Sequence, residues 1–213
     1  MSRYRAVIFD LGGVVFPSPI DVFRSYEQEH GLPHRFLSEV VLADAEGGAW
    51  ARLERGELTV PEFCVAFEAE CAAAGQRIDA TALMGAVAGG FDPRPEMVRA
   101  LRALRARGLR TGALTNNWAT DGSGDAAERG LTTLADLFDT IVESAVEGLR
   151  KPDPRIYEVV CTRLEVAPQE SVFLDDLGVN LKTARALGMT TIKVGDPTEA
   201  LAELSDVLGF PLD

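Results

Sequence analysis

Short apolar runs alternate with amphipathic stretches along most of the chain, and each run ends in a cluster of polar residues or glycine. This alternation is typical of an α/β protein with a parallel sheet, because a helix must return the chain to the same sheet edge after each strand. Thr59 with Glu62, and Asp153 with Pro154, have the patterns of two helix starts. Five runs are predicted to be strands, at residues 5–9, 110–114, 140–143, 171–174 and 190–194.

The first two predicted strands are separated by far more chain than one crossover needs. Asp10 and Thr115 are 105 positions apart, whereas a whole strand–helix–strand unit takes roughly 30 residues. Residues 17–90 have helical periodicity and contain no good strand candidate. They are therefore predicted to form a helical cap inserted directly after the first strand, and residues 1–16 and 91–213 form the core.

The charge balance excludes several classes of partner. The chain has 33 acidic and 21 basic residues, a formal net charge of −12 at pH 7, so neither nucleic acid nor an anionic membrane is an expected partner. The longest stretch without a charge, 80–91, has only 12 residues, too few to span a bilayer. Three cysteines without metal-ligand spacing predict neither a disulfide framework nor a zinc site, and we expect a cytoplasmic location. Nothing in the sequence indicates the oligomeric state.

Chemically active residues gather where the predicted strands end. In an open parallel sheet, ligands bind beyond the carboxyl ends of the strands. The segments that follow these ends supply carboxylates, a hydroxyl group, backbone amides and a cation, which are the groups that phosphoryl transfer requires. Taken singly, each of these features is more often a turn or a cap, but four in one order favour a site. The four segments are 9–14, 114–118, 150–154 and 174–180.

Three carboxylates predict a nucleophile and a magnesium site. Asp10 can attack phosphorus with one oxygen and hold a cation with the other, next to glycines that let the backbone approach a ligand. Asp175 and Asp176 complete a site of hard oxygen ligands that suits Mg²⁺. Of this pair, Asp176 is the expected direct ligand.

The remaining candidates are donors for the phosphate of a small phosphorylated substrate. The hydroxyl group of Thr115 and the backbone amide of Asn116 can donate to phosphoryl oxygens. Lys151, held next to Pro152, supplies positive charge where negative charge builds up. Asn180 is counted with the substrate-binding residues and is expected to orient Lys151 or the acidic pair.

These motifs resemble those of the haloacid dehalogenase superfamily over the whole chain. The closer resemblance is to the N-terminal phosphatase domain of soluble epoxide hydrolase and the related domain of acyl-CoA dehydrogenase fusion proteins. It rests on the segments 114–118 (LTNNW), 150–157 (RKPDPRIY) and 173–185 (FLDDLGVNLKTAR). The resemblance implies a Rossmann-like sheet of five parallel strands in the spatial order five, four, one, two, three, with an inserted helical cap of the first type.

The same resemblance implies a ligand set and an intermediate. Mg²⁺ would be bound by the Asp10 carboxylate, the Gly12 carbonyl group and Asp176, and a phosphoaspartyl intermediate would form on Asp10. One residue departs from the pattern, because most phosphatases of the superfamily have an Asp where this chain has Gly12. That Asp is a general acid and base, and such a group typically contributes about 10² to 10⁴ in rate.

Gly12 leaves three interpretations open. The substrates have good leaving groups, or a cap residue such as His34 or Glu46 supplies the acid, or the chain is a phosphate-binding or regulatory module with weak or no catalysis. A metal-independent dehalogenase also fits Gly12, although the acidic pair favours a metal. The leading hypothesis is a Mg²⁺-dependent phosphatase of a small organic phosphate. The cap residues Trp50, Arg52 and Glu54 are candidates to face the site, although a Trp in a helical cap is more often a core residue. The substrate itself is not readable from the sequence.

Overall fold

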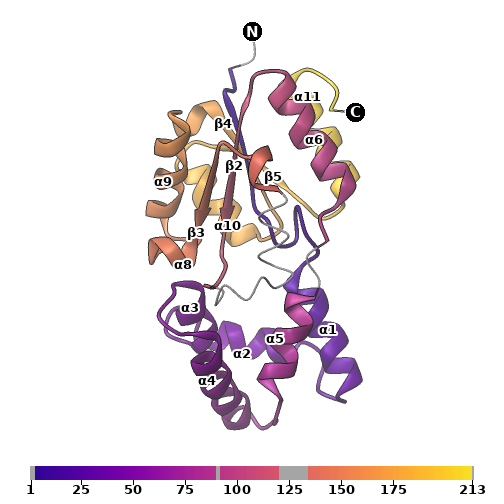
Figure 1. Cartoon of the computed structure of the whole chain (residues 1–213), viewed down its shortest axis with the longest axis vertical. Coiled ribbons are helices and arrows are strands. Elements are labelled where there is room, and N and C mark those ends of the chain that lie inside the picture. The colour runs from indigo at the N-terminus through magenta and orange to yellow at the C-terminus, as the bar shows by residue number, and fades with distance from the viewer. Residues whose placement is uncertain (1–2, 90–91, 120–133, 213) are drawn as a thin grey trace.

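A five-stranded parallel sheet forms the centre of the computed structural model, which describes residues 3–89, 92–119 and 134–212 (Figure 1). The spatial order is β3-β2-β1-β4-β5, which confirms the predicted α/β fold and strand order. The observed strands differ from the predicted ones by at most one residue at either end. They are β1 (Ala6–Phe9), β2 (Arg110–Thr115), β3 (Thr140–Glu143), β4 (Ser171–Asp175) and β5 (Thr190–Lys193).

Helices cover both faces of the sheet, so the central strand is buried on both sides. Val7 and Phe9 of β1 pack with α6 and α11, whereas Ala6 and Ile8 pack with α9 and α10 on the opposite face. All four side chains have no exposed surface, which explains why β1 is a continuous apolar run rather than an alternating one. The helices are α6 (Pro95–Ala106), α9 (Pro154–Leu164), α10 (Gly178–Ala186) and α11 (Pro197–Leu208), with the shorter elements η1 (Ala135–Leu137), α8 (Ser144–Glu147) and η2 (Pro168–Glu170).

Five further helices lie between β1 and α6, beyond the carboxyl ends of the strands (Figure 1). Phe63, Phe67 and Leu83 belong to an apolar cluster that these helices build with one another. We call them the inserted helices. The helical character predicted for this segment agrees with the structure, while the division of the chain at residues 17 and 90 stays a prediction. The inserted helices are α1 (Pro19–Glu29), α2 (Phe36–Ala43), α3 (Ala49–Glu54), α4 (Val60–Ala73) and α5 (Ala80–Ala88).

Both predicted helix starts are present. Thr59 and Glu62 form a capping box at the start of α4, and the Asp153 side chain accepts a hydrogen bond from the backbone of α9. The three cysteines are free and buried. Within the described parts of the chain, no helix is both long enough and apolar enough to cross a membrane.

Candidate active site

Three carboxylates converge where β1 and β4 end. Asp10 follows β1, Asp175 is the last residue of β4, and Asp176 comes next. Because β1 and β4 are paired neighbours, one ligand oxygen from each of the three residues lies within 4.8 Å of the others. Asp10 and Asp175 are buried, and Asp176 is partly exposed. Carboxylates held this close repel one another unless a cation or a proton intervenes.

Lys151 bridges two of these carboxylates. Its Nζ lies 2.8 Å from Asp10 Oδ1 and 2.8 Å from Asp175 Oδ2, and the residue is only 1% exposed. Burial alone would lower the pKa of Lys151, but the charges of Asp10 and Asp175 outweigh it and raise the pKa. Lys151 is therefore a fixed positive charge at the centre of the site.

Asp10 has one oxygen engaged and one available. Oδ1 accepts hydrogen bonds from the Leu11 backbone N–H (2.7 Å) and from Lys151. Among the residues that the structure describes, none donates a hydrogen bond to Oδ2. Burial raises the pKa of Asp10, and Asp175 and Asp176 act in the same direction, against the opposing effect of Lys151. A desolvated carboxylate with one free oxygen has the arrangement of a nucleophile.

Asp175 is held by its neighbours on every side. Oδ1 accepts from the Leu177 backbone N–H at 2.8 Å, and Asn180 Nδ2 lies 3.1 Å from both oxygens. With Lys151 on Oδ2 as well, a fully buried carboxylate has each oxygen engaged. Asn180, which sequence analysis counted as substrate-binding, is directed at Asp175 and is itself 2% exposed, so its place fits the expected orienting role.

Asp176 faces the backbone that follows β1. Burial raises the pKa of Asp176 to about 6, and the charge of Asp175 adds to this effect. Gly13 has a φ of 80°, and a Cβ atom there would collide with the Asp176 carboxylate. Glycine at position 13 therefore permits this close approach. The donor set of Asp10 and Asp176 oxygens fits a hard divalent cation such as Mg²⁺.

Thr115 and Asn116 end the neighbouring strand β2. Thr115 is 4% exposed, beside the carboxyl end of β1. The Asn116 side chain holds the Lys151 backbone, because its Oδ1 accepts from the Lys151 N–H (2.8 Å) and its Nδ2 donates to the Lys151 carbonyl oxygen (3.1 Å). Sequence analysis predicted only a role for the Asn116 backbone, because nothing in the local pattern shows which distant loop a carboxamide will contact.

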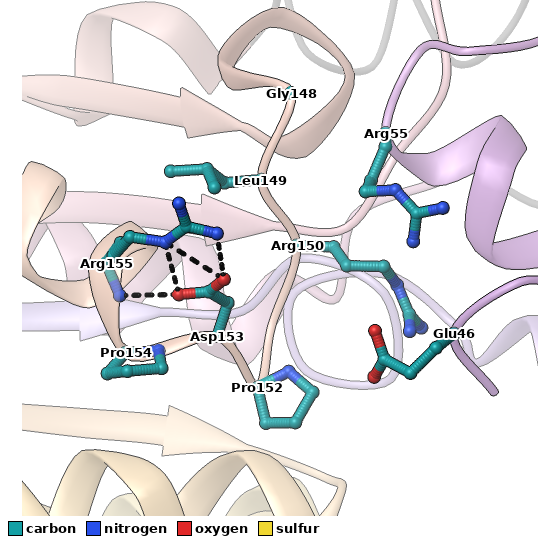
Figure 2. A pocket seen from close by; sticks show the side chains of 9 residues that line it. All are labelled: Glu46, Arg55, Gly148, Leu149, Arg150, Pro152, Asp153, Pro154 and Arg155. Carbon is teal, nitrogen blue, oxygen red and sulfur yellow. Dashed lines mark hydrogen bonds and ion pairs between the residues drawn. The ribbon is translucent and has the colours of Figure 1, made fainter.

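The two residues considered as substitute acids are exposed. His34 lies in the turn before α2, and Glu46 lies in the turn before α3. Glu46 lines a cavity of about 550 Å³ together with Arg55 and residues 148–150 and 152–155; Figure 2 shows these side chains. None of the three clustered carboxylates lines that cavity. Within the described parts of the chain, no hydrogen bond or ion pair joins His34 or Glu46 to Asp10, Asp175 or Asp176, and their role as acids stays a prediction.

Of the three cap residues considered as candidates to face the site, Glu54 contacts the segment that contains Lys151. It is 7% exposed and pairs with Arg150 at 2.7 Å. Burial raises its pKa, while the charge of Arg150 and a hydrogen bond from Trp50 oppose the rise. Trp50 packs edge-on against Trp118 of the core, with ring centroids 6.1 Å apart. Arg52 instead pairs with Glu57, and its side chain is 43% exposed.

The arrangement has counterparts among known proteins. A family model of haloacid dehalogenase-like hydrolases matches residues 4–188. The chain belongs to this family. A hydrolase of the family from Bacteroides thetaiotaomicron, solved in complex with magnesium and inorganic phosphate, superposes with a TM-score of 0.63 at 21% identity, over 91% of this chain and 96% of that one. At this identity the likeness supports the fold.

Three relatives match this hydrolase over nearly its whole length. Acyl-CoA dehydrogenase family member 10 of Mus musculus is 39% identical over 212 residues, and bifunctional epoxide hydrolase 2 of Sus scrofa is 35% identical over 225 residues. Each alignment covers 98% of this chain but only 20% and 39% of the two relatives. A sesquiterpene phosphatase of Aspergillus oryzae is 29% identical over 209 residues, 98% of both proteins. The predicted resemblance is confirmed.

Proposed function

We propose that this hydrolase is a Mg²⁺-dependent phosphatase of a small organic phosphate and that it acts through a phosphoaspartyl intermediate on Asp10. One observation supports the proposal: three carboxylates converge at the ends of two adjacent central strands, and a single lysine bridges two of them. With all three ionised, Lys151 balances only one of three negative charges. A divalent cation and a phosphoryl group together satisfy such a site.

In the proposed reaction, the free Oδ2 of Asp10 attacks phosphorus, and the bond to the leaving oxygen breaks. Lys151 and the donors of Thr115 and Asn116 hold the phosphoryl oxygens as charge builds up on them. Water then attacks the phosphorus of the phosphoaspartate, releasing inorganic phosphate and restoring Asp10. Mg²⁺, bound by Asp10, Asp176 and the Gly12 carbonyl group, would supply further positive charge. Asp175 keeps Lys151 in place through both steps.

The relatives lend support to this proposal. The Aspergillus oryzae relative, which this chain matches over 98% of both lengths, is a sesquiterpene phosphatase. The Bacteroides thetaiotaomicron hydrolase of the same fold was solved with magnesium and inorganic phosphate. Both point to a phosphorylated small molecule as substrate.

Gly12 favours a second candidate, a phosphate-binding module with weak or no turnover. Without a carboxylate at that position the leaving oxygen must take its proton from elsewhere, and a cap residue such as His34 or Glu46 stays a candidate for that role. A metal-independent dehalogenase would also work without this carboxylate. A metabolite phosphatase screen with and without Mg²⁺ separates the phosphatase from the other two functions, and of those two only the dehalogenase would release halide from a haloacid.

Magnesium is expected to stabilise the folded chain. The three carboxylates are close together only in the folded state, so Mg²⁺ should bind the folded chain in preference to the unfolded one. At about 100 times its Kd, Mg²⁺ should therefore raise the Tm by about 5 °C or more. The shift should be larger at about pH 7.5 than at about pH 5, because Asp176, with a pKa of about 6 in the absence of metal, is protonated in acid and protons then compete with the cation. Thermal unfolding of the wild type and of Asp176→Asn, with and without Mg²⁺ at both pH values, measures the shift in Tm. No shift, together with unchanged activity in EDTA, would contradict the metal-dependent proposal.

Replacing Gly12 by Asp is expected to raise activity on alkyl phosphates. The backbone there is outside the left-handed region, and a Cβ atom would meet only Pro19, at 3.4 Å or more, so neither backbone strain nor a Cβ clash opposes the substitution. A carboxyl group could then protonate a poor leaving group, and we expect a gain of about 10-fold or more. For p-nitrophenyl phosphate, whose leaving group needs little protonation, the gain should be small.

Gly85→Asp is the matched control, because Gly85 is exposed on α5 and a Cβ atom there meets nothing within 4 Å. Steady-state rates on both substrate types give the comparison, with a melting curve to verify folding. An unchanged alkyl phosphatase rate in folded Gly12→Asp would mean that another acid already serves.

A further inference from the structure

Glu54, the last residue of α3, is a buried carboxylate of the inserted helices that contacts the core. Oε2 accepts hydrogen bonds from Arg150 Nε at 2.7 Å, and Asn116 Nδ2 lies 3.5 Å away. Oε1 accepts from the Trp50 indole N–H at 2.9 Å. Both oxygens are thus already engaged by donors. Glu54 is placed to act on the core through these partners.

The two core partners of Glu54 are the two residues that fix the Lys151 backbone. Arg150 directly precedes Lys151, and its Nη1 also donates to the Ala45 carbonyl oxygen at 2.9 Å. Asn116 holds both the N–H and the carbonyl oxygen of Lys151. The Lys151 ammonium group in turn contacts Asp10 and Asp175. Direct contacts therefore run from α3 to the nucleophile without a gap.

We propose that Glu54 is a positioning residue, which anchors Arg150 and Asn116 so that the Lys151 ammonium group and the backbone amide of Asn116 sit correctly against the Asp10 nucleophile. The role rests on the proposed function, because these two donors are the ones assigned there to the phosphoryl oxygens. The inserted helices thereby contribute to catalysis by a fixed contact, in addition to any contact with the substrate. Displacement of a catalytic group by about 1 Å is enough to lower a rate roughly 100-fold.

Glu54→Gln tests the proposal, and Glu57→Gln is the matched control. Both glutamates pair with an arginine, but Glu57 binds Arg55 and its side chain is 46% exposed. We expect Glu54→Gln to lower kcat on p-nitrophenyl phosphate roughly 10- to 100-fold with little change in KM, because the misplaced donors act mainly in the transition state. Glu57→Gln should keep the wild-type kcat. A purely structural role would lower the Tm and leave the kcat of the folded fraction unchanged.

A second readout does not depend on turnover. The Lys151 amide N–H is held by the Asn116 side chain, so hydrogen exchange in the peptide that contains it should accelerate in Glu54→Gln and stay at the wild-type rate in Glu57→Gln. If the wild type has no phosphatase activity, the proposed function fails while this measurement still decides the positioning role.

Arg150→Lys, on the core side, covers the case in which Glu54→Gln does not fold. It keeps the charge but loses the planar fork that binds Glu54 and Ala45 together, and we expect the same faster exchange at Lys151 and the same loss of kcat. Wild-type exchange and wild-type kcat in a folded Glu54→Gln or Arg150→Lys protein would overturn the proposal.

Discussion

Asp10→Asn is expected to lower phosphatase turnover by at least about 10⁴-fold, because the amide has the size of the carboxylate but lacks the attacking charge. The fold should survive the change. Lys151 keeps its contact with Asp175 at 2.8 Å, and the loss of one of three clustered negative charges relieves repulsion. Steady-state kinetics on p-nitrophenyl phosphate and a melting curve measure the two expectations.

Asp21→Asn is the control for this substitution. Asp21 is also an aspartate with a basic partner, Arg24 at 2.8 Å, but its side chain is 58% exposed on α1. It should keep the wild-type rate. If Asp10→Asn retained more than about one hundredth of the wild-type rate, a loss far smaller than removal of a nucleophile causes, Asp10 would not be the nucleophile.

Lys151→Met is expected to damage both activity and stability. The substitution keeps an unbranched chain but leaves Asp10 and Asp175 buried without their cation, and breaking a buried ion pair in this way costs about 3 to 5 kcal/mol of unfolding free energy. Turnover should fall at least about 10³-fold, because the charge that faces the phosphoryl group is lost. The loss of stability should shrink as pH falls, because protonation of Asp10 and Asp176, whose pKa values burial raises, removes the repulsion.

Urea unfolding at several pH values tests this expectation, with Lys182→Met as the control. Lys182 is an exposed lysine on the helix that follows the acidic pair, and its replacement should change the unfolding free energy by less than about 0.5 kcal/mol. Stability of Lys151→Met equal to that of the wild type at neutral pH would show that the clustered carboxylates do not depend on Lys151.

The strands and the strand-end residues were predictable from the sequence because both depend on local pattern. The run at residues 6–9 is apolar on both faces, and Asp10 follows it directly, so the position of this carboxylate at the sheet edge comes from the order of residues alone. The glycine at position 13 has a reason that only the fold shows, which is the approach of Asp176 across the β1–β4 pair.

The contact between the inserted helices and the Lys151 segment was only partly predictable. Glu54 was a candidate to face the site, but its pairing with Arg150 joins residues 96 positions apart. No periodicity in the sequence specifies such a pair, because it depends on how two separately packed parts meet. Glu46, considered as a substitute acid, lies in an exposed turn beside a cavity that none of the clustered carboxylates lines, and its role stays a prediction.

The most direct test of the central claim is a search for the phosphoryl group on Asp10. The wild-type protein is mixed with Mg²⁺ and p-nitrophenyl phosphate and quenched in acid during turnover. It is then digested, and the masses of the peptides are measured by mass spectrometry. We predict the added mass of one phosphoryl group on the peptide that contains Asp10, and its absence from that peptide in Asp10→Asn. Turnover with the phosphoryl group on a different residue, or with Asp10 never modified at any quench time, would contradict the account.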